Sequence, residues 1–169
     1  FTSEPLAPDM PHEMTGFPMA ELWVTSTQPD GDFLAVLEEV SADGQSTYVT
    51  DGVIRASHRT VAPNPVADTV GIPFHPSTEK DVQEKRTEGL SQPVLLKFNL
   101  EPISYRFRDG SRIRLTVFCA ETVTYQHPMY DPENLPVISL YTGGEAASSL
   151  TLPMIPDREL PFALPEKKC

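Results

Sequence analysis

Two blocks of sequence decide the fold class of this chain. The first runs Asp30-Gly-Asp-Phe-Leu-Ala-Val-Leu-Glu-Glu-Val40, passes Asp43-Gly44, and returns as Thr47-Tyr-Val-Thr-Asp-Gly-Val-Ile-Arg-Ala-Ser-His-Arg59. The second runs Leu100-Glu-Pro-Ile-Ser-Tyr-Arg-Phe-Arg-Asp-Gly-Ser-Arg-Ile-Arg-Leu115. In each block an apolar run, an Asp-Gly pair and a second apolar run follow one another, which is the pattern of two strands joined by a turn.

Alternating apolar residues predict further strands, because successive side chains of a strand point to opposite faces of its sheet. The segments predicted as strands are residues 20–26, 33–40, 47–50, 53–57, 94–100, 112–119, 137–141 and 149–154. Between two of them, Asp51-Gly52 predicts a bulge or bend. The run 33–40 ends in Glu38 and Glu39, so we expect its other end to be the more deeply buried one.

The remaining segments predict long connections. The chain contains 18 prolines, about twice the usual ~5%, and proline is excluded from helix interiors and central strands. Residues 1–19 predict an extended lead-in that is partly strand, and residues 60–76 and 120–135 predict long loops. Residues 78–88 are densely charged without an apolar stripe, which favours a solvated loop over an exposed helix.

This pattern predicts an all-β protein with little helix. Strand spacing and long connections favour a jelly-roll β-sandwich of the galactose-binding-like type over a simple meander. We expect one domain over residues 1–169, with a flexible tail at 157–169. Because the first residue is Phe1 and not Met, we also expect a piece excised from a larger protein.

Composition restricts the partners. The net charge is −11, with 13 Lys and Arg against 24 Asp and Glu, which argues against nucleic acid and anionic membranes as partners. No apolar run approaches the ~20 residues of a membrane helix. Cys119 lies in an alternating strand and is expected to pack as a small hydrophobic residue, while Cys169 is terminal. Two such cysteines predict no disulfide framework and fix no redox compartment.

The serines do not predict a catalytic nucleophile. A nucleophile elbow, G-x-S-x-G, needs glycines on both sides of a strained strand-to-helix turn. Ser46 has only the preceding glycine, in Gly44-Gln-Ser46-Thr-Tyr48, and Ser111 follows Gly110 in a turn that leads into a strand. We therefore predict no catalytic residue in this chain.

The metal-ligating residue types are scattered, so neither a metal nor another cofactor is predicted. His12, His58, His75 and His127 lack H-x-x-x-H or H-E-x-x-H spacing, and we expect them at the surface or at an interface. Asp30 and Asp32 flank Gly31, and Asp131 lies near Glu133, but calcium needs six to eight oxygen ligands. Turn formation explains the first pair without an ion.

Two further groups of residues have both a binding and a structural interpretation. Arg106, Arg108, Arg112 and Arg114 surround one turn, and we expect them to pair with Glu and Asp of neighbouring strands rather than to bind an acidic ligand. Trp23 in a strand, with Tyr125 and Tyr130 in a loop beside His127, would be the only aromatic platform for a sugar. We expect these aromatic side chains to pack loops together or against another domain.

The order of several short motifs resembles the C-terminal β-domain of the X-prolyl dipeptidyl peptidase and cocaine-esterase-like acyl hydrolases. The matching stretches are Thr2-Ser-Glu-Pro-Leu6, Met14-Thr-Gly16, Leu22-Trp-Val-Thr-Ser26, Asp30-Gly-Asp-Phe33, Thr50-Asp-Gly52, Arg55-Ala-Ser-His-Arg59, the block from Leu100 to Leu115, and Ser149-Leu-Thr-Leu-Pro153. The chain departs from the pattern at Ser111, where the family form Gly-His-Arg-Ile-Arg-Leu has His. It also lacks the Asn-Pro run that relatives carry after Cys119.

This resemblance implies that the chain is the non-catalytic accessory domain of a serine hydrolase. The parent would carry an α/β-hydrolase domain upstream of Phe1, with Ser, Asp and His in that chain order. The β-domain would pack on it, help to wall its active-site cleft and in some cases support a homo-oligomer. Two alternatives remain open: a free-standing carbohydrate-binding module and an oligomerisation module.

Overall fold

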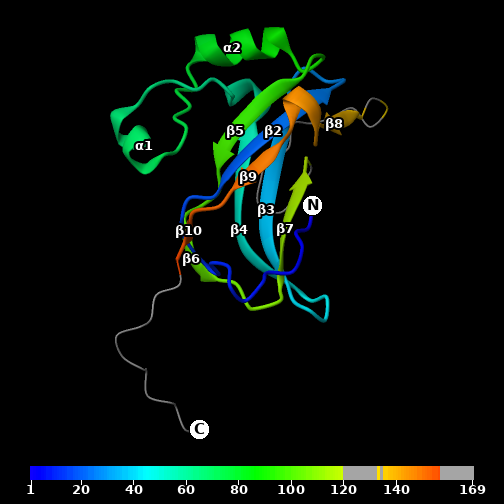
Figure 1. The fold of residues 1–169 in the computed structure, drawn as a ribbon. Helices are drawn as coiled ribbons and strands as arrows, with labels where there is room; N and C mark the ends of the chain where they lie inside the picture. Colours follow the sequence, from blue (N-terminus) through cyan, green and yellow to red (C-terminus); the bar gives the residue numbers. More distant parts are fainter. Residues whose placement is uncertain (120–132, 134, 157–169) are drawn as a thin grey trace.

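The computed structural model describes residues 1–119, 133 and 135–156, and in this part the protein is mostly β (Figure 1). The strands are β1 (Glu13–Gly16), β2 (Met19–Ser26), β3 (Asp32–Val40), β4 (Ser46–Arg55), β5 (Val94–Asn99), β6 (Ile103–Arg106), β7 (Arg112–Phe118), β8 (Ile138–Leu140), β9 (Ser149–Thr151) and β10 (Met154–Ile155). The helices are α1 (Pro65–Val70) and α2 (Glu79–Glu88), with short 3₁₀ turns η1 (Ala56–His58) and η2 (Gly144–Ala146). Neither α1 nor α2 is long and apolar enough to cross a membrane, which holds for the described residues only.

The described strands form three small antiparallel sheets. Their orders are β10-β1-β6, β5-β2-β8 with β9 also paired to β2, and β4-β3-β7. The β2 sheet lies over the β3 sheet (Figure 1), and buried side chains from both join one apolar core. This arrangement confirms the all-β prediction in its coarse form and the strand predictions in most of their positions.

The strand alternation predicted which side chains enter the core. Leu22 and Val24 of β2 are buried, and Leu96 and Phe98 of β5 lie directly beside this face. The lead-in also follows its prediction: residues 13–16 form β1, and Thr2 pairs with Arg114 of β7. The first three residues of β3 after Asp32 are buried, as expected from their apolar character.

The first half of β3 is the more continuously buried one, as expected, but Glu39 near its other end is also only 1% exposed. Its side chain points to the same side as Leu37, and polar groups of the chain between β6 and β7 surround it. A sequence pattern assigns Glu to solvent by default, but a carboxylate with enough hydrogen bonds can be buried.

The bulge lies at a different place from the predicted one. Leu37 pairs with Thr50 while Glu38 pairs with Tyr48, so Val49 is the extra residue of β4. Val49 and Thr50 are consequently both buried although they are consecutive. Gly52 sits inside the continuous strand, where a Cβ atom would lie 2.6 Å from the carbonyl oxygen of Asn99. This glycine therefore permits close approach of two backbones and does not form a bend.

The prediction of a solvated loop at 78–88 was wrong, because Glu79–Glu88 is α2. Thr78 caps the helix by accepting from the N–H of Asp81, and Gly89 ends it with a positive φ of 66°. Acidic residues occupy the first turn and basic residues the last, as the helix dipole favours. None of its residues is buried, so caps and charges stabilise a helix that has no apolar stripe.

Replacing Gly52 by Ala is expected to lower the free energy of unfolding by about 2 kcal/mol, because the new methyl group overlaps fixed backbone atoms. Gly143→Ala is the matched control: its backbone is extended and its added methyl would meet no atom within 4 Å. Urea denaturation of both variants checks this. Equal stability of the two variants would contradict the close-approach argument.

Candidate functional site

The two serines singled out by the sequence both hold structural contacts. Ser46 lies at the start of β4, where its hydroxyl donates to Glu38 Oε1 at 2.6 Å and accepts from Arg114. Ser111 is 1% exposed and donates to the carbonyl oxygen of Arg108 at 2.8 Å. Neither hydroxyl lies against a histidine in these contacts, so the arrangement does not activate a nucleophile.

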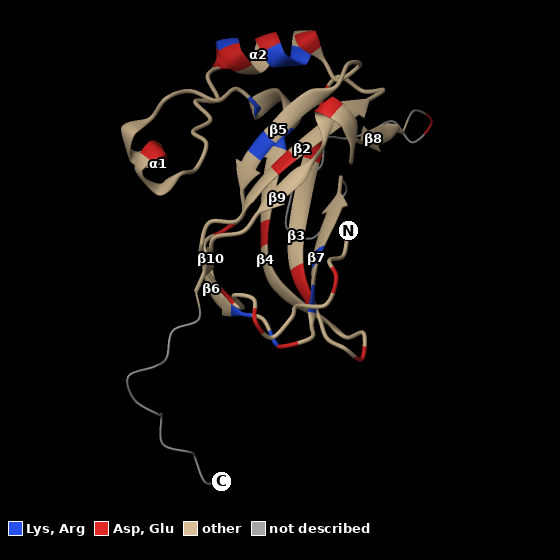
Figure 2. Cartoon of the chain, viewed as in Figure 1, with Lys and Arg blue, Asp and Glu red and all other residues tan. Residues whose placement is uncertain are grey.

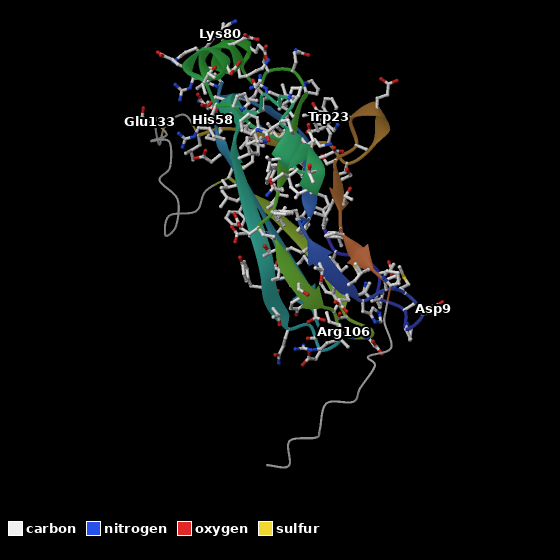
Figure 3. All side chains as sticks on the ribbon, turned by 90° about the vertical axis from the view of Figure 1, so that its left-hand side faces the viewer. Asp9, Trp23, His58, Lys80, Arg106 and Glu133 are labelled. Carbon is white, nitrogen blue, oxygen red and sulfur yellow. The ribbon has the colours of Figure 1, made fainter. Side chains whose placement is uncertain are left out.

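The histidines are held separately, each by its own local partner. His58 pairs with the Ser77 hydroxyl at 2.9 Å, and His75 Nδ1 lies 3.0 Å from the carbonyl oxygen of Thr60. Figure 3 shows His58 near the α2 end of the molecule and Arg106 near the opposite end, so the candidate residues are not brought together. His127 lies outside the described residues.

His12, which we expected at the surface or at an interface, is buried within the domain. It is 1% exposed, with Nδ1 3.0 Å from Asp109 Oδ1 and Nε2 3.1 Å from the carbonyl oxygen of Ala7. The imidazole thus links the lead-in to the turn before β7. Its role is structural, and its contacts contain no second metal-ligating histidine.

The paired aspartates of the turn at Gly31 also serve the fold. Asp32 receives a bidentate hydrogen bond from Arg55 at 2.7 and 2.8 Å. Asp30 accepts from the backbone N–H of Ser57 at 2.8 Å and from Arg86 at 3.1 Å. Burial opposes ionisation of Asp30, but hydrogen bonds from Ser57, Gly31 and Arg86 outweigh it and hold its pKa below the ordinary value.

Within residues 1–119, 133 and 135–156, no group of three or more His, Cys, Asp or Glu is placed to hold a metal ion. Asp131 lies outside these ranges. Cys119 packs against the core, and burial, together with the charge of Asp32, raises the pKa of its thiol to about 11. At neutral pH this thiol is therefore a poor nucleophile.

Arg108, Arg112 and Arg114 each lie near a carboxylate, and the pair of Arg114 with Glu38 joins neighbouring strands as predicted. Arg114 of β7 binds Glu38 of β3 with both Nε and Nη2 at 2.9 Å. Arg108 lies 3.7 Å from Glu39, and Arg112 lies 3.7 Å from Glu4. Arg106 also makes an interaction. The Glu38 pair is the best formed of these, because it is bidentate and joins adjacent strands.

Glu39 is the buried counterpart of Glu38. It accepts from the backbone N–H of Arg108 at 2.6 Å and from the Tyr105 hydroxyl at 2.7 Å. Burial alone would raise its pKa, but these hydrogen bonds outweigh burial and lower it. Burial and the hydrogen bond to Glu39 raise the pKa of Tyr105 to about 12. The pair stabilises the connection between β6 and β7, with Glu39 buried and Tyr105 partly exposed.

Two surfaces remain that the fold does not use. The first is a cleft of about 420 Å³ between the first residues, β7 and the β2 sheet. Its lining carries no charged side chain and consists of Phe1, Thr2, Ser3, Leu22, Ile113, Leu115, Leu140, Thr142, Ser148, Ser149, Leu150 and Leu152. Such a lining suits apolar contact and offers no acid or base.

The second surface is the projecting segment 60–77, which the sequence analysis treated as a plain loop. It contains α1 and exposes several large apolar side chains. The helix had a sequence signal: Asn64 before Pro65 is a cap followed by proline at the first helical position, and Gly71 ends the helix. Of the predicted aromatic platform, Trp23 lies in β2, and Tyr125 and Tyr130 lie outside the described residues.

Comparison with known proteins identifies the family to which the chain belongs. Residues 1–151 match the X-Pro dipeptidyl-peptidase C-terminal non-catalytic domain family. The chain belongs to this family. The family is that of a non-catalytic domain, and the resemblance drawn from the sequence motifs is confirmed.

Three relatives illustrate the family. A Mycobacterium bovis protein assigned as a candidate serine esterase is 33% identical over 155 residues, which are 92% of this chain and 23% of that protein. Cocaine esterase from Rhodococcus is 38% identical over 61 residues, 36% of this chain and 11% of the enzyme. A CocE/NonD family hydrolase from Staphylococcus aureus shares the fold with a TM-score of 0.67 at 22% identity, over 92% of this chain and 30% of that one. The chain thus spans about a quarter of the Mycobacterium bovis protein's length.

The Glu38–Arg114 pair predicts a specific dependence of stability on pH. Hydrogen bonds from Arg114, together with Ser46 and Thr116, lower the pKa of Glu38 from 4.5 to about 2 despite partial burial. Because the folded-state pKa is the lower one, the contribution is complete above about pH 4.5 and is lost as pH falls toward 2. Glu38→Gln is expected to cost about 1–2 kcal/mol at pH 7.

Urea denaturation of parent and Glu38→Gln at pH 7, 4.5 and 3 measures this contribution. The difference in unfolding free energy is expected to stay constant down to pH 4.5 and to shrink below it. Glu84→Gln, at an exposed position of α2, serves as the control and should differ little from the parent at each pH. A difference that does not change with pH would show that the pair contributes nothing through ionisation.

Removal of the buried carboxylate is expected to be more damaging. Glu39→Ala should lower the unfolding free energy by about 3 kcal/mol, because it leaves the Tyr105 hydroxyl and the Arg108 N–H without their acceptor. Tyr105→Phe removes one donor only and should cost about 1 kcal/mol. Thermal and urea unfolding of both variants provide the test, and the reverse order of the two costs would contradict this account.

Proposed function

We propose that this chain is the accessory domain of a serine acyl hydrolase of esterase or X-prolyl dipeptidyl-peptidase type. In that protein it packs on an α/β-hydrolase domain of the same polypeptide, helps to wall the active-site cleft and contributes no catalytic residue. The observation that carries this proposal is the match to the Mycobacterium bovis protein, which covers nearly all of this chain and less than a quarter of that relative.

The site geometry supports the proposal in two ways. The serines, histidines and carboxylates discussed above are engaged in contacts that stabilise strands and turns. The uncharged cleft beside Phe1 and the apolar segment 60–77 are surfaces suited to contact with another protein domain.

We further propose a jelly-roll topology of the galactose-binding-like type. It is supported by strand orders in which sequence neighbours fall into different sheets, such as β2 with β5 and β8 but β3 with β4 and β7. Chain crossings between two facing antiparallel sheets are the mark of that architecture.

Activity assays on two forms of the protein test the proposed function. The 169-residue chain is expected to hydrolyse neither p-nitrophenyl esters nor X-Pro p-nitroanilides above the buffer rate. The complete polypeptide encoded by the gene is expected to hydrolyse at least one class and to be inactivated by a serine-directed phosphonylating reagent. Turnover by the 169-residue chain, or a complete polypeptide without a G-x-S-x-G elbow, would overturn the proposal.

A further inference from the structure

Residues 60–77, which we call the excursion, leave the sheets after η1 and return before α2, carrying α1 away from them (Figure 1). Four large apolar side chains on it face solvent: Val66 is 77% exposed, Val70 51%, Val61 50% and Phe74 38%. Of the helix only Ala67 is buried. A concentration of apolar side chains on one projecting segment is unusual for a surface that meets only water.

The helix of the excursion is fixed by its own backbone chemistry. The Asn64 side chain accepts from the N–H groups of Val66 and Ala67, each at 3.0 Å. At the other end Gly71 takes a φ of 72°, and the N–H of Ile72 donates to the carbonyl oxygen of Ala67. Caps at both ends hold a helix of six residues that has almost no core contact of its own.

The base of the excursion is also fixed. Ala62 pairs with Phe74 across the two arms, with the N–H of Ala62 donating to the Phe74 carbonyl oxygen at 3.0 Å. His75 lies within hydrogen-bond distance of the Thr60 carbonyl oxygen. The apolar side chains are therefore presented in one arrangement before any partner binds, which reduces the entropy lost on association.

Charge separates the excursion from its neighbour α2. The excursion contains one charged side chain, Asp68, whereas the ten residues of α2 contain seven: Glu79, Lys80, Asp81, Glu84, Lys85, Arg86 and Glu88. Figure 2 shows this contrast, with both colours along α2 and a single red position on α1. In a chain of net charge −11, α2 has the composition of a solvated surface and the excursion has that of a contact surface.

A groove of about 790 Å³ lies at the base of the excursion. Its apolar lining includes Phe74 and Leu95, and Arg59, Lys85 and Lys97 also line it. Each of these cations is paired with a glutamate, at 2.9, 2.7 and 2.6 Å respectively. Asp68 also lines the groove. An apolar surface bordered by a few charged side chains, most of them paired, has the anatomy of a protein–protein interface.

We propose that the excursion is the docking surface for the hydrolase portion of the same polypeptide. This inference rests on the proposed function, and it adds which surface makes the contact. The occupant follows from chain length, because the aligned region covers only 23% of the Mycobacterium bovis relative. In a polypeptide of that kind the remaining three quarters is tethered at high effective concentration, whereas a second copy of an acidic chain is repelled.

Hydrogen–deuterium exchange of the 169-residue chain and of the complete polypeptide tests the inference. The backbone amides of residues 60–77 are expected to exchange at least tenfold more slowly in the complete polypeptide. The double variant Val66→Glu and Val70→Glu is expected to remove this protection there while leaving the melting temperature of the 169-residue chain unchanged. Val137→Glu, at a position that is 68% exposed and directly precedes β8, which lies on the opposite side of the view from α1 (Figure 1), is expected to leave the protection intact.

The outcomes separate this inference from the function on which it rests. Protection elsewhere in the domain with none at 60–77 would overturn the docking surface and leave the accessory role standing. Identical exchange throughout the domain in both forms would overturn both. Protection of 60–77 that appears in the 169-residue chain with rising concentration would identify a second copy as the occupant and overturn the inference. Should the double variant fail to fold, the exchange comparison of the parent forms still decides.

Discussion

The arrangement of the sheets depends on the buried carboxylate of Glu39. This side chain projects from β3 and accepts hydrogen bonds from β6 and from the connection that follows β6. Tyr105 belongs to β6, and Arg108 lies in the connection from β6 to β7. The orientation of the β10-β1-β6 sheet relative to the β4-β3-β7 sheet is thereby tied to two short hydrogen bonds. An apolar side chain at this position could fill the space but could not fix the direction of the donors.

Polar and charged residues stabilise the domain where its elements lack an apolar face. The turn at Gly31 is held by Asp30 and Asp32, and α2 is attached to the body through Arg59 and Arg86. These side chains are therefore engaged within the domain itself. Such use of polar side chains among the described residues fits the non-catalytic domain family to which the chain belongs.

The sequence predicted those parts of the structure that depend on local periodicity. β2, β3, β5 and β7 were predicted because two-residue alternation records which face is buried. The helix α2 was missed because it has no buried residue, so its periodicity carries no apolar signal. The burial of Glu39 was not predicted because its partners lie 66 and 69 residues away in the chain, and such pairings leave no trace in a local pattern. The helix α1 was missed because six helical residues are too few to establish a period, although Asn64, Pro65 and Gly71 mark its ends.

The contacts of Ser111 show how the structure constrains the interpretation of a residue that differs from the family pattern. The family form of the motif has His where this chain has Ser111, and a histidine in a hydrolase invites a catalytic interpretation. The structure places Ser111 in the turn that carries Arg108. The Ser111 hydroxyl donates to the Arg108 carbonyl oxygen, and the backbone N–H of Arg108 donates to Glu39. A change of side chain at this point alters how the turn holds the buried carboxylate, and so acts on stability. Under the proposed function, differences that affect hydrolysis would instead be sought where side chains meet a neighbouring domain, because this domain would influence the active-site cleft only through that contact.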